Sequence, residues 1–156
     1  MHINVLAIGT RAPRWVDTGV AEYVKRLPKH INLNFTTFNA AARNRAGTAE
    51  KCRSDEGERL LKAIPRNAYV IALDERGEAW TSRDLAGHLE HWLGNYSDVA
   101  LLIGGADGLS DQVKQTAARQ WSLAPLTLPH ALVRVVLAEQ IYRAWTLLQG
   151  HPYHRD

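Results

Sequence analysis

The chain has 156 residues, enough for one hydrophobic core and too few for two comfortable domains, so a single domain over residues 1–156 is expected. Hydrophobic residues make up 46% and charged residues 22% of the chain, values near globular averages that exclude a disordered or fibrous protein. The net charge of +3 is uneven, because residues 11–53 carry nine Lys or Arg against three Asp or Glu. That basic half favours a polyanionic partner such as RNA, although a solvated basic surface is the plainer alternative.

The cysteine content and the N-terminus indicate where the protein works. A single cysteine, Cys52, can form neither an internal disulfide nor a cysteine-based zinc site, which fits a reducing compartment. The N-terminal run reads as a strand, with no basic leader and no apolar stretch long enough to span a bilayer. A cytoplasmic protein without a membrane partner is therefore expected.

Short apolar runs alternate with helix-length amphipathic segments along the chain. This pattern predicts an α/β fold in which a mostly parallel sheet is covered by helices on both faces. Strands are predicted at His2–Ile8, Ile31–Phe38, Ala68–Leu73, Asp98–Ile103 and Gln120–Ala124. Helices are predicted at Trp15–Leu27, Thr48–Ile64, Ser82–Leu93, Ser110–Arg119 and His130–Gln149, with Ser82 and Ser110 as N-caps and Gly94 and Gly150 as stops.

Three glycines, Gly104, Gly105 and Gly108, follow the fourth predicted strand and precede a helix. Such a loop lets a ligand approach the backbone closely, and ligands of open parallel sheets bind beyond the carboxyl ends of the strands. The loop after Leu73 would emerge at the same edge, so the two loops are expected to share a pocket. The spacing is not that of a dinucleotide-binding motif, and a simple tight turn is an equally good interpretation.

The segment from Gln120 to His130 is apolar but broken by Pro125 and Pro129, so it can be neither a regular central strand nor a helix throughout. Irregular backbone leaves N–H and C=O groups free, and the edge of an adenine ring could use them.

The last predicted helix is apolar on nearly all sides, which indicates either complete burial or an interface and favours a homodimer. Arg134, Glu139 and Arg143 interrupt it. Glu139 and Arg143 are spaced as an i,i+4 ion pair, while Arg134 and Arg143 could equally face a substrate, and the sequence leaves both interpretations open.

The chain ends in His151, Pro152, Tyr153, His154, Arg155 and Asp156. These residues carry two imidazoles, a phenol, a guanidinium and a carboxylate, which are groups that catalytic sites use. Termini are usually disordered unless something ties them down. Because this tail directly follows a long predicted helix, we expect it to be anchored and to form part of a site. A solvated polar end, or a histidine-rich tract with weak metal affinity, is the alternative, and no metal centre is expected.

With these segments in view, the chain resembles along essentially its whole length the large-subunit ribosomal RNA methyltransferase H family of the SPOUT, or α/β-knot, superfamily. The resemblance rests on Leu73-Asp74, Ile103-Gly104-Gly105 through Gly108, Ser122-Leu123 through Thr127-Leu128-Pro129-His130, Leu132-Val133-Arg134, Glu139 to Ala144 and the closing His-Pro-Tyr-His-Arg. No single motif is decisive, but the set in this order is highly specific.

The resemblance implies S-adenosylmethionine-dependent methylation of N3 of a pseudouridine in large-subunit (23S) ribosomal RNA, on the RNA or the ribosome, by a homodimer with a C-terminal trefoil knot. It implies cofactor-binding positions at Leu73, Gly104, Gly105, Gly108, Leu123, Ala124, Pro125, Leu126, Thr127 and Leu128. Ala124 and Pro125 depart from the usual family pattern, and Pro125 has no N–H to offer the cofactor.

Removing the N3 proton of a pseudouridine calls for a base, and the flanking carbonyl oxygens call for a cation. His154 is the expected base, with His130 as the alternative, and Arg155 or Arg143 is the expected cation. Tyr153 is expected to stack on or hydrogen-bond the RNA base. Two other classes stay open: a non-enzymatic ribosome-associated RNA-binding protein, and a flavodoxin-like nucleotide-binding enzyme, for which phosphate-binding residues are missing.

Overall fold

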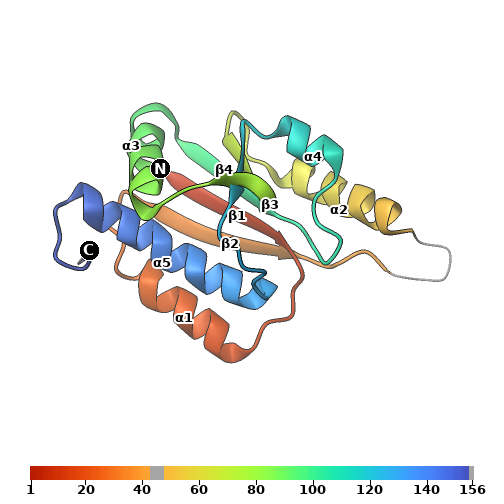
Figure 1. The fold of residues 1–156 in the computed structure, drawn as a ribbon, viewed down its shortest axis with the longest axis horizontal. Helices are drawn as coiled ribbons and strands as arrows, with labels where there is room; N and C mark the ends of the chain where they lie inside the picture. Colours follow the sequence, from red (N-terminus) through yellow and green to blue (C-terminus); the bar gives the residue numbers. More distant parts are fainter. Residues whose placement is uncertain (43–47, 155–156) are drawn as a thin grey trace.

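The computed structural model describes residues 1–42 and 48–154 and contains one five-stranded sheet in the order β2-β1-β4-β3-β5 (Figure 1). All the paired strands are parallel, which confirms the predicted sheet type. The strands are β1 (His2–Ile8), β2 (Asn32–Phe38), β3 (Tyr69–Ala79), β4 (Asp98–Ile103) and β5 (Arg119–Ser122).

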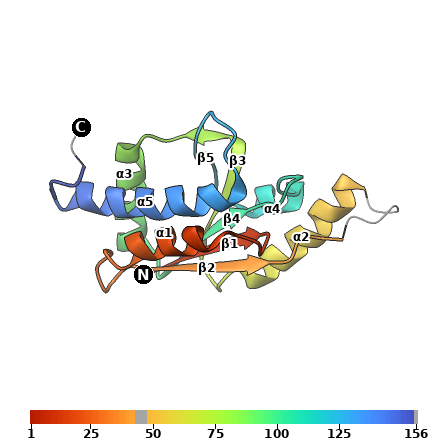
Figure 2. The ribbon, with the colours of Figure 1, turned by 90° about the horizontal axis from the view of Figure 1, so that it is seen from below.

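Helices cover both faces of this sheet (Figures 1 and 2). They are α1 (Arg14–Val24), α2 (Ala49–Ala63), α3 (Ser82–Asn95), α4 (Asp111–Thr116) and α5 (His130–Leu148). Buried side chains of α3 and α5 pack with one face, whereas Leu60 of α2 and Val113 of α4 pack with the other. Strand β1 shows the period of two directly, because Ile3 and Val5 belong to the first cluster and Leu6 and Ile8 to the second. Burial on both faces therefore explains why β1 contains few charged residues.

The structure differs from the sequence prediction most clearly in β3. The predicted strand ends at Leu73, but β3 continues through an irregularity between Leu73 and Glu78 and pairs again with β5. Gly77 allows this approach, since a Cβ there would lie 2.6 Å from the backbone of Gln120. The charged run after Leu73 hid the extension, because it lacks the apolar pattern of a buried strand.

Several predicted boundaries are also wrong, since α1 ends at Val24 instead of Leu27 and α4 ends at Thr116, before β5 begins at Arg119. Helix α3 is capped by Thr81 rather than Ser82, because the Thr81 hydroxyl accepts from the Asp84 N–H at 3.1 Å and the Asp84 carboxylate accepts from the Thr81 N–H at 2.8 Å. Gly94 lies inside α3, whereas Gly150, with φ of +63°, ends α5 as predicted. None of the helices in the described ranges is both long and apolar enough to cross a lipid bilayer.

Candidate active site

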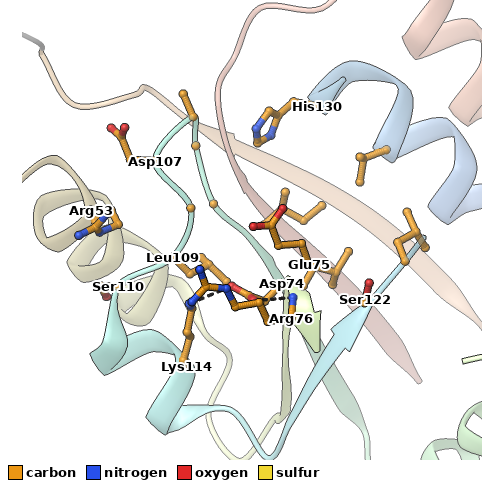
Figure 3. A pocket seen from close by; sticks show the side chains of 18 of the residues that line it. Arg53, Asp74, Glu75, Arg76, Asp107, Leu109, Ser110, Lys114, Ser122 and His130 are labelled. Atoms are coloured by element: carbon orange, nitrogen blue, oxygen red, sulfur yellow. Dashed lines mark hydrogen bonds and ion pairs between the residues drawn. The ribbon is translucent and has the colours of Figure 1, made fainter. Parts of the chain in front are cut away.

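A pocket of about 720 Å³ opens between the irregular part of β3 after Leu73 and the glycine loop that follows β4 (Figure 3). The segment after β5 and the first turn of α5 complete it. Its volume lies within the range of about 300–1,000 Å³ that small-molecule and cofactor sites occupy. The ten residues that the resemblance assigns to the cofactor all line this pocket: Leu73, Gly104, Gly105, Gly108, Leu123, Ala124, Pro125, Leu126, Thr127 and Leu128.

The glycines of the loop are required first by the loop's own folding. Gly108 has φ of +79° and donates its N–H to the Gly105 carbonyl at 3.0 Å. A Cβ at Gly104 would lie 2.5 Å from the carbonyl carbon of Gly108, and one at Gly105 would lie 3.0 Å from both Ile8 and Glu56. The predicted ligand loop is thus a tight turn, as one of the two interpretations had it, and it also forms one wall of a pocket.

The wall opposite the glycine loop is the irregular segment after β5. The Ser122 hydroxyl donates to the Ala124 carbonyl at 3.3 Å. Within residues 1–42 and 48–154, the amides from Leu123 to Leu128 make no backbone hydrogen bonds. Backbone polar groups that face a pocket need a partner from solvent or from a ligand. The free amides and the pocket volume therefore fit the edge of a nucleoside such as that of S-adenosylmethionine.

An ion pair crosses the pocket between Asp74, at the irregularity of β3, and Lys114 of α4, with 2.9 Å between Oδ2 and Nζ. The other carboxylate oxygen of Asp74 accepts from the Arg76 N–H at 2.9 Å. Burial raises the pKa of Asp74, but the hydrogen bonds from Lys114 and Arg76 outweigh it and hold the pKa below its usual range. Asp74 is accordingly a carboxylate that ties the floor of the pocket to α4.

Sequence reasoning missed several residues of the pocket. Lys114 lies one turn after Ser110, which caps α4 as predicted, so its place near the glycine loop could have been inferred from helical spacing. Glu50, Arg53 and Ser54 reach the pocket from α2, and no motif marks them. Among the described residues, no three His, Cys, Asp or Glu side chains come together in a group that could hold a metal ion.

Helix α5 brings His130 to the pocket and turns Arg134 away from it. His130 is the first residue of the helix, is exposed and lines the pocket (Figure 3). Arg134 is buried one turn later and donates to the carbonyl of Gly9, at the end of β1. Of the two interpretations of Arg134, the structure favours the structural one, because its guanidinium holds the connection between β1 and α1.

The tail leaves the far end of α5 and folds back to the middle of the helix. The Tyr153 hydroxyl donates to the Glu139 carboxylate at 3.0 Å, and Arg143 pairs with the same carboxylate at 2.7 Å. The Tyr153 ring meets that of Tyr142 edge to face, with 4.7 Å between centroids. The tail is therefore tied down as far as the described residues reach. Nδ1 of His154 is enclosed and has no hydrogen-bond partner among them, and Arg155 lies outside them.

The predicted catalytic groups consequently lie at two places in one chain. His130 begins α5 at the pocket, whereas the tail folds back along the helix to Glu139, nine residues or about 14 Å further along its axis (Figures 1 and 2). Tyr153, His154 and Arg143 do not line the pocket. Among the predicted acid–base and carbonyl-binding groups that the structure describes, His130 alone lines it.

Known proteins are similar to this chain over nearly its whole length. Residues 1–154 match the family model described as "Predicted SPOUT methyltransferase". The chain is 47% identical to "Ribosomal RNA large subunit methyltransferase H" of Hydrogenovibrio crunogenus over 156 residues, all of both chains. It is 50% identical over 155 residues to the protein of that name from Nitrosococcus oceani, with 99% of each covered.

Solved structures show the same fold at low sequence identity. A probable methyltransferase from Bordetella pertussis Tohama I superposes with a TM-score of 0.55 at 16% identity, over 91% of this chain and 95% of that one. A putative methylase family protein from Neisseria gonorrhoeae gives a TM-score of 0.52 at 17% identity, over 90% and 80%. The fold, the pocket and the match over nearly the full length lead to one conclusion, that this chain belongs to the SPOUT methyltransferase family.

Proposed function

We propose that this chain methylates N3 of a pseudouridine in large-subunit ribosomal RNA, with S-adenosylmethionine as the methyl donor. The observation that carries the proposal is the pocket at the carboxyl edge of the sheet, where all the positions implied for the cofactor meet. The names of the full-length relatives support the RNA substrate. The basic half of the sequence supports a polyanionic partner.

The residues of the pocket fit this cofactor. The amides between Leu123 and Leu128 are available to the adenine edge, except at Pro125, which has no N–H. The glycine loop forms the facing wall. When bound, S-adenosylmethionine supplies an electrophilic methyl group on a sulfonium. The knotted threading that the resemblance implies for these loops is part of the proposal.

Most of the rate acceleration is expected to come from positioning, since in-line orientation of the reacting groups can contribute about 7–11 kcal/mol. The remaining task of the protein is to take a proton from N3 and to stabilise the negative charge that spreads onto two carbonyl oxygens. His154 as base and Arg155 or Arg143 as the cation remain the proposed groups, with His130 as the alternative base. A positioned base contributes on the order of 10²–10⁴-fold.

Because Arg143, Tyr153 and His154 do not line the pocket, one chain does not bring these groups to the cofactor positions. Leu132 and Val136, one turn apart on α5, are only partly buried in the single chain, which leaves apolar surface for a second copy. A twofold dimer in which the α5 helices pack in opposite directions would carry the tail of each chain to the pocket of the other. We therefore propose a homodimer with two shared active sites.

Mixed dimers test both the chemistry and the sharing. Ala124→Phe is chosen to fill the pocket, since a side chain at Gly105 would strike Ile8 and Glu56 with or without cofactor. Ala118→Phe, at an exposed alanine outside the pocket, is the matched control. Calorimetry should show loss of S-adenosylmethionine binding in Ala124→Phe and retention in Ala118→Phe.

Dimers that combine one Ala124→Phe chain with one His154→Ala chain should regain methyl transfer to ribosomes lacking the modification. In such a dimer, the intact pocket receives an intact tail from its partner. Neither parent homodimer should be active at a comparable rate. A mixed dimer as inactive as its parents would contradict the shared site, and wild-type protein that neither binds the cofactor nor methylates ribosomes would contradict the proposed function.

A further inference from the structure

Trp15 is unusually exposed for a tryptophan. Its side chain is 55% accessible, and Trp15 and Leu126, at 74%, are the two large hydrophobic residues that stand out as exposed in the described chain. Tryptophan is highly buried on average, but a single exposed hydrophobic residue is normal on a folded domain, so the groups near Trp15 decide whether it binds a partner. Leu126 belongs to the pocket wall, and Trp15 has no place in the site described above.

The packing of α1 on α5 puts Trp15 at the pocket end of the molecule. A Cβ on Gly19 would lie 3.3 Å from Val135, and further along, the rings of Tyr23 and Tyr142 are 6.4 Å apart. The later residue of α1, Tyr23, contacts the later residue of α5, Tyr142. The two helices therefore run parallel, as Figure 2 shows. The first turn of α1, with Trp15, therefore lies beside the first turn of α5, whose His130 lines the pocket.

The backbone that carries Trp15 is held firmly although its side chain is exposed. Gly9 donates to the Phe38 carbonyl at 2.7 Å and accepts from the buried Arg134. The next residue in α1, Val16, is fully buried and donates its N–H to the Pro13 carbonyl at 3.0 Å. An indole fixed in this way loses little conformational freedom when a ligand stacks on it.

Positive charge surrounds the exposed indole. Arg11 and Arg14 are exposed, and neither has an ion-pair partner within residues 1–42 and 48–154. Asp17, the acidic residue of the first turn, is exposed nearby and pairs with neither of them. At the far end of α1, by contrast, Lys25 and Arg26 both pair with Glu22. Among the described residues, Arg11 and Arg14 are thus cations without an ion pair at the start of α1, close to Trp15 in the chain.

We propose that Trp15, Arg11 and Arg14 form a docking surface for single-stranded RNA beside the pocket mouth. A base next to the target nucleotide stacks on the Trp15 indole, and the two guanidiniums contact flanking phosphates. Stacked aromatics between cations are the usual means by which proteins bind unpaired RNA. The inference rests on the proposed RNA methyltransferase function and adds to it a surface outside the cofactor pocket.

The stacking is tested by methyl transfer to large ribosomal subunits lacking the modification. Trp15→Ala should raise the KM for subunits on the order of ten-fold or more, with kcat and S-adenosylmethionine affinity near wild type, because stacking on a flanking base contributes equally before and during the reaction. Trp15→Phe should restore most of the KM, since it keeps an aromatic face.

The phosphate contacts are tested by the salt dependence of binding to a fluorescently labelled single-stranded RNA. Removing both cations in Arg11→Ala/Arg14→Ala should lower the slope of log affinity against log salt by about 1.4. Lys29→Ala, an exposed cation beyond the other end of α1, is the matched control and should leave the slope unchanged.

Several outcomes would overturn the docking surface while leaving the proposed function intact. One is a Trp15→Ala enzyme that methylates subunits with wild-type KM. Another is a Trp15→Ala protein that sediments as a monomer when wild type is a dimer, since Trp15 would then be a contact between copies of this chain. An unchanged salt slope in Arg11→Ala/Arg14→Ala would remove the two arginines from the RNA contact.

Discussion

The Tyr153 hydroxyl donates a hydrogen bond to the Glu139 carboxylate, with 3.0 Å between the oxygens, and this contact joins the tail to α5. Arg143 shares the same carboxylate and lies over the Tyr153 ring, 5.2 Å from its centroid. Burial, together with the hydrogen bond to Glu139, raises the pKa of Tyr153 to about 12. Tyr153 therefore stays a neutral donor at neutral pH and is suited to hold the tail rather than to remove a proton.

The raised pKa predicts a specific behaviour in alkali. A group whose pKa is raised by folding stabilises the fold below its unfolded pKa, near 10, and loses that contribution as the pH rises through the folded value of about 12. In an alkaline titration of tyrosinate absorbance, Tyr153→Phe should remove a phase that ionises later than an ordinary tyrosine. Loss of an ordinary phase near pH 10 instead would show that the contact with Glu139 does not form.

The pair between Asp74 and Lys114 predicts a change in acid stability. Because the folded pKa of Asp74 lies below its unfolded value, its contribution is present above about pH 4 and disappears as the pH falls through the folded pKa. Urea unfolding at pH 7 should show that Asp74→Asn destabilises the protein by about 1 kcal/mol, less at pH 3.

A double-mutant cycle separates the pair from its surroundings. Once Asp74 is Asn, the further change Lys114→Met should cost less than it does in the wild type, because the partner is already gone. Strictly additive costs would show that the two side chains act independently, and the pocket floor would then not depend on their contact.

The same Gly→Ala substitution should have opposite effects on stability in the glycine loop and in α3. Gly104→Ala should destabilise the protein by about 1–3 kcal/mol, because its Cβ would lie 2.5 Å from the backbone of Gly108, which cannot move aside easily. Gly87→Ala, in α3, meets nothing within 4 Å and should stabilise by about 0.5–1 kcal/mol through its better helix propensity. Chemical denaturation of both variants measures the contrast, and equal effects would contradict the close packing of the loop.

The sequence predicts the bounds of a strand best where the strand is buried on both faces. The bounds of β1 and β4 match the prediction, because a strand buried on both faces reads as an uninterrupted apolar run. The extension of β3 was missed since its second half is charged and pairs through Gly77, which carries no hydrophobic signal. The apolar pattern of the sequence thus predicts buried strands well, but it does not predict the charged second half of β3.

The sequence likewise predicted only part of the pocket. The meeting of the residues after Leu73 with the glycine loop was expected from their shared edge and is confirmed, but the segment after Leu73 is an irregular part of β3 and not a loop. Arg53 of α2 was not expected, since its place depends on how α2 packs across the sheet. Nor could the sequence show that Tyr153 and His154 lie outside the pocket, because it does not reveal how the chain folds back along α5 after the helix ends.

The position of the tail leads to the last prediction. Deleting residues 153–156 removes the contact with Glu139 and the proposed base, but it changes nothing that lines the pocket. The truncated protein should therefore bind S-adenosylmethionine with near wild-type affinity in calorimetry, while methyl transfer to ribosomes lacking the modification falls by about 10²-fold or more. Mixing it with an Ala124→Phe chain should restore transfer, as the partner supplies the missing tail. Near wild-type turnover by the truncated protein alone would instead move the role of the base to His130, at the pocket end of α5.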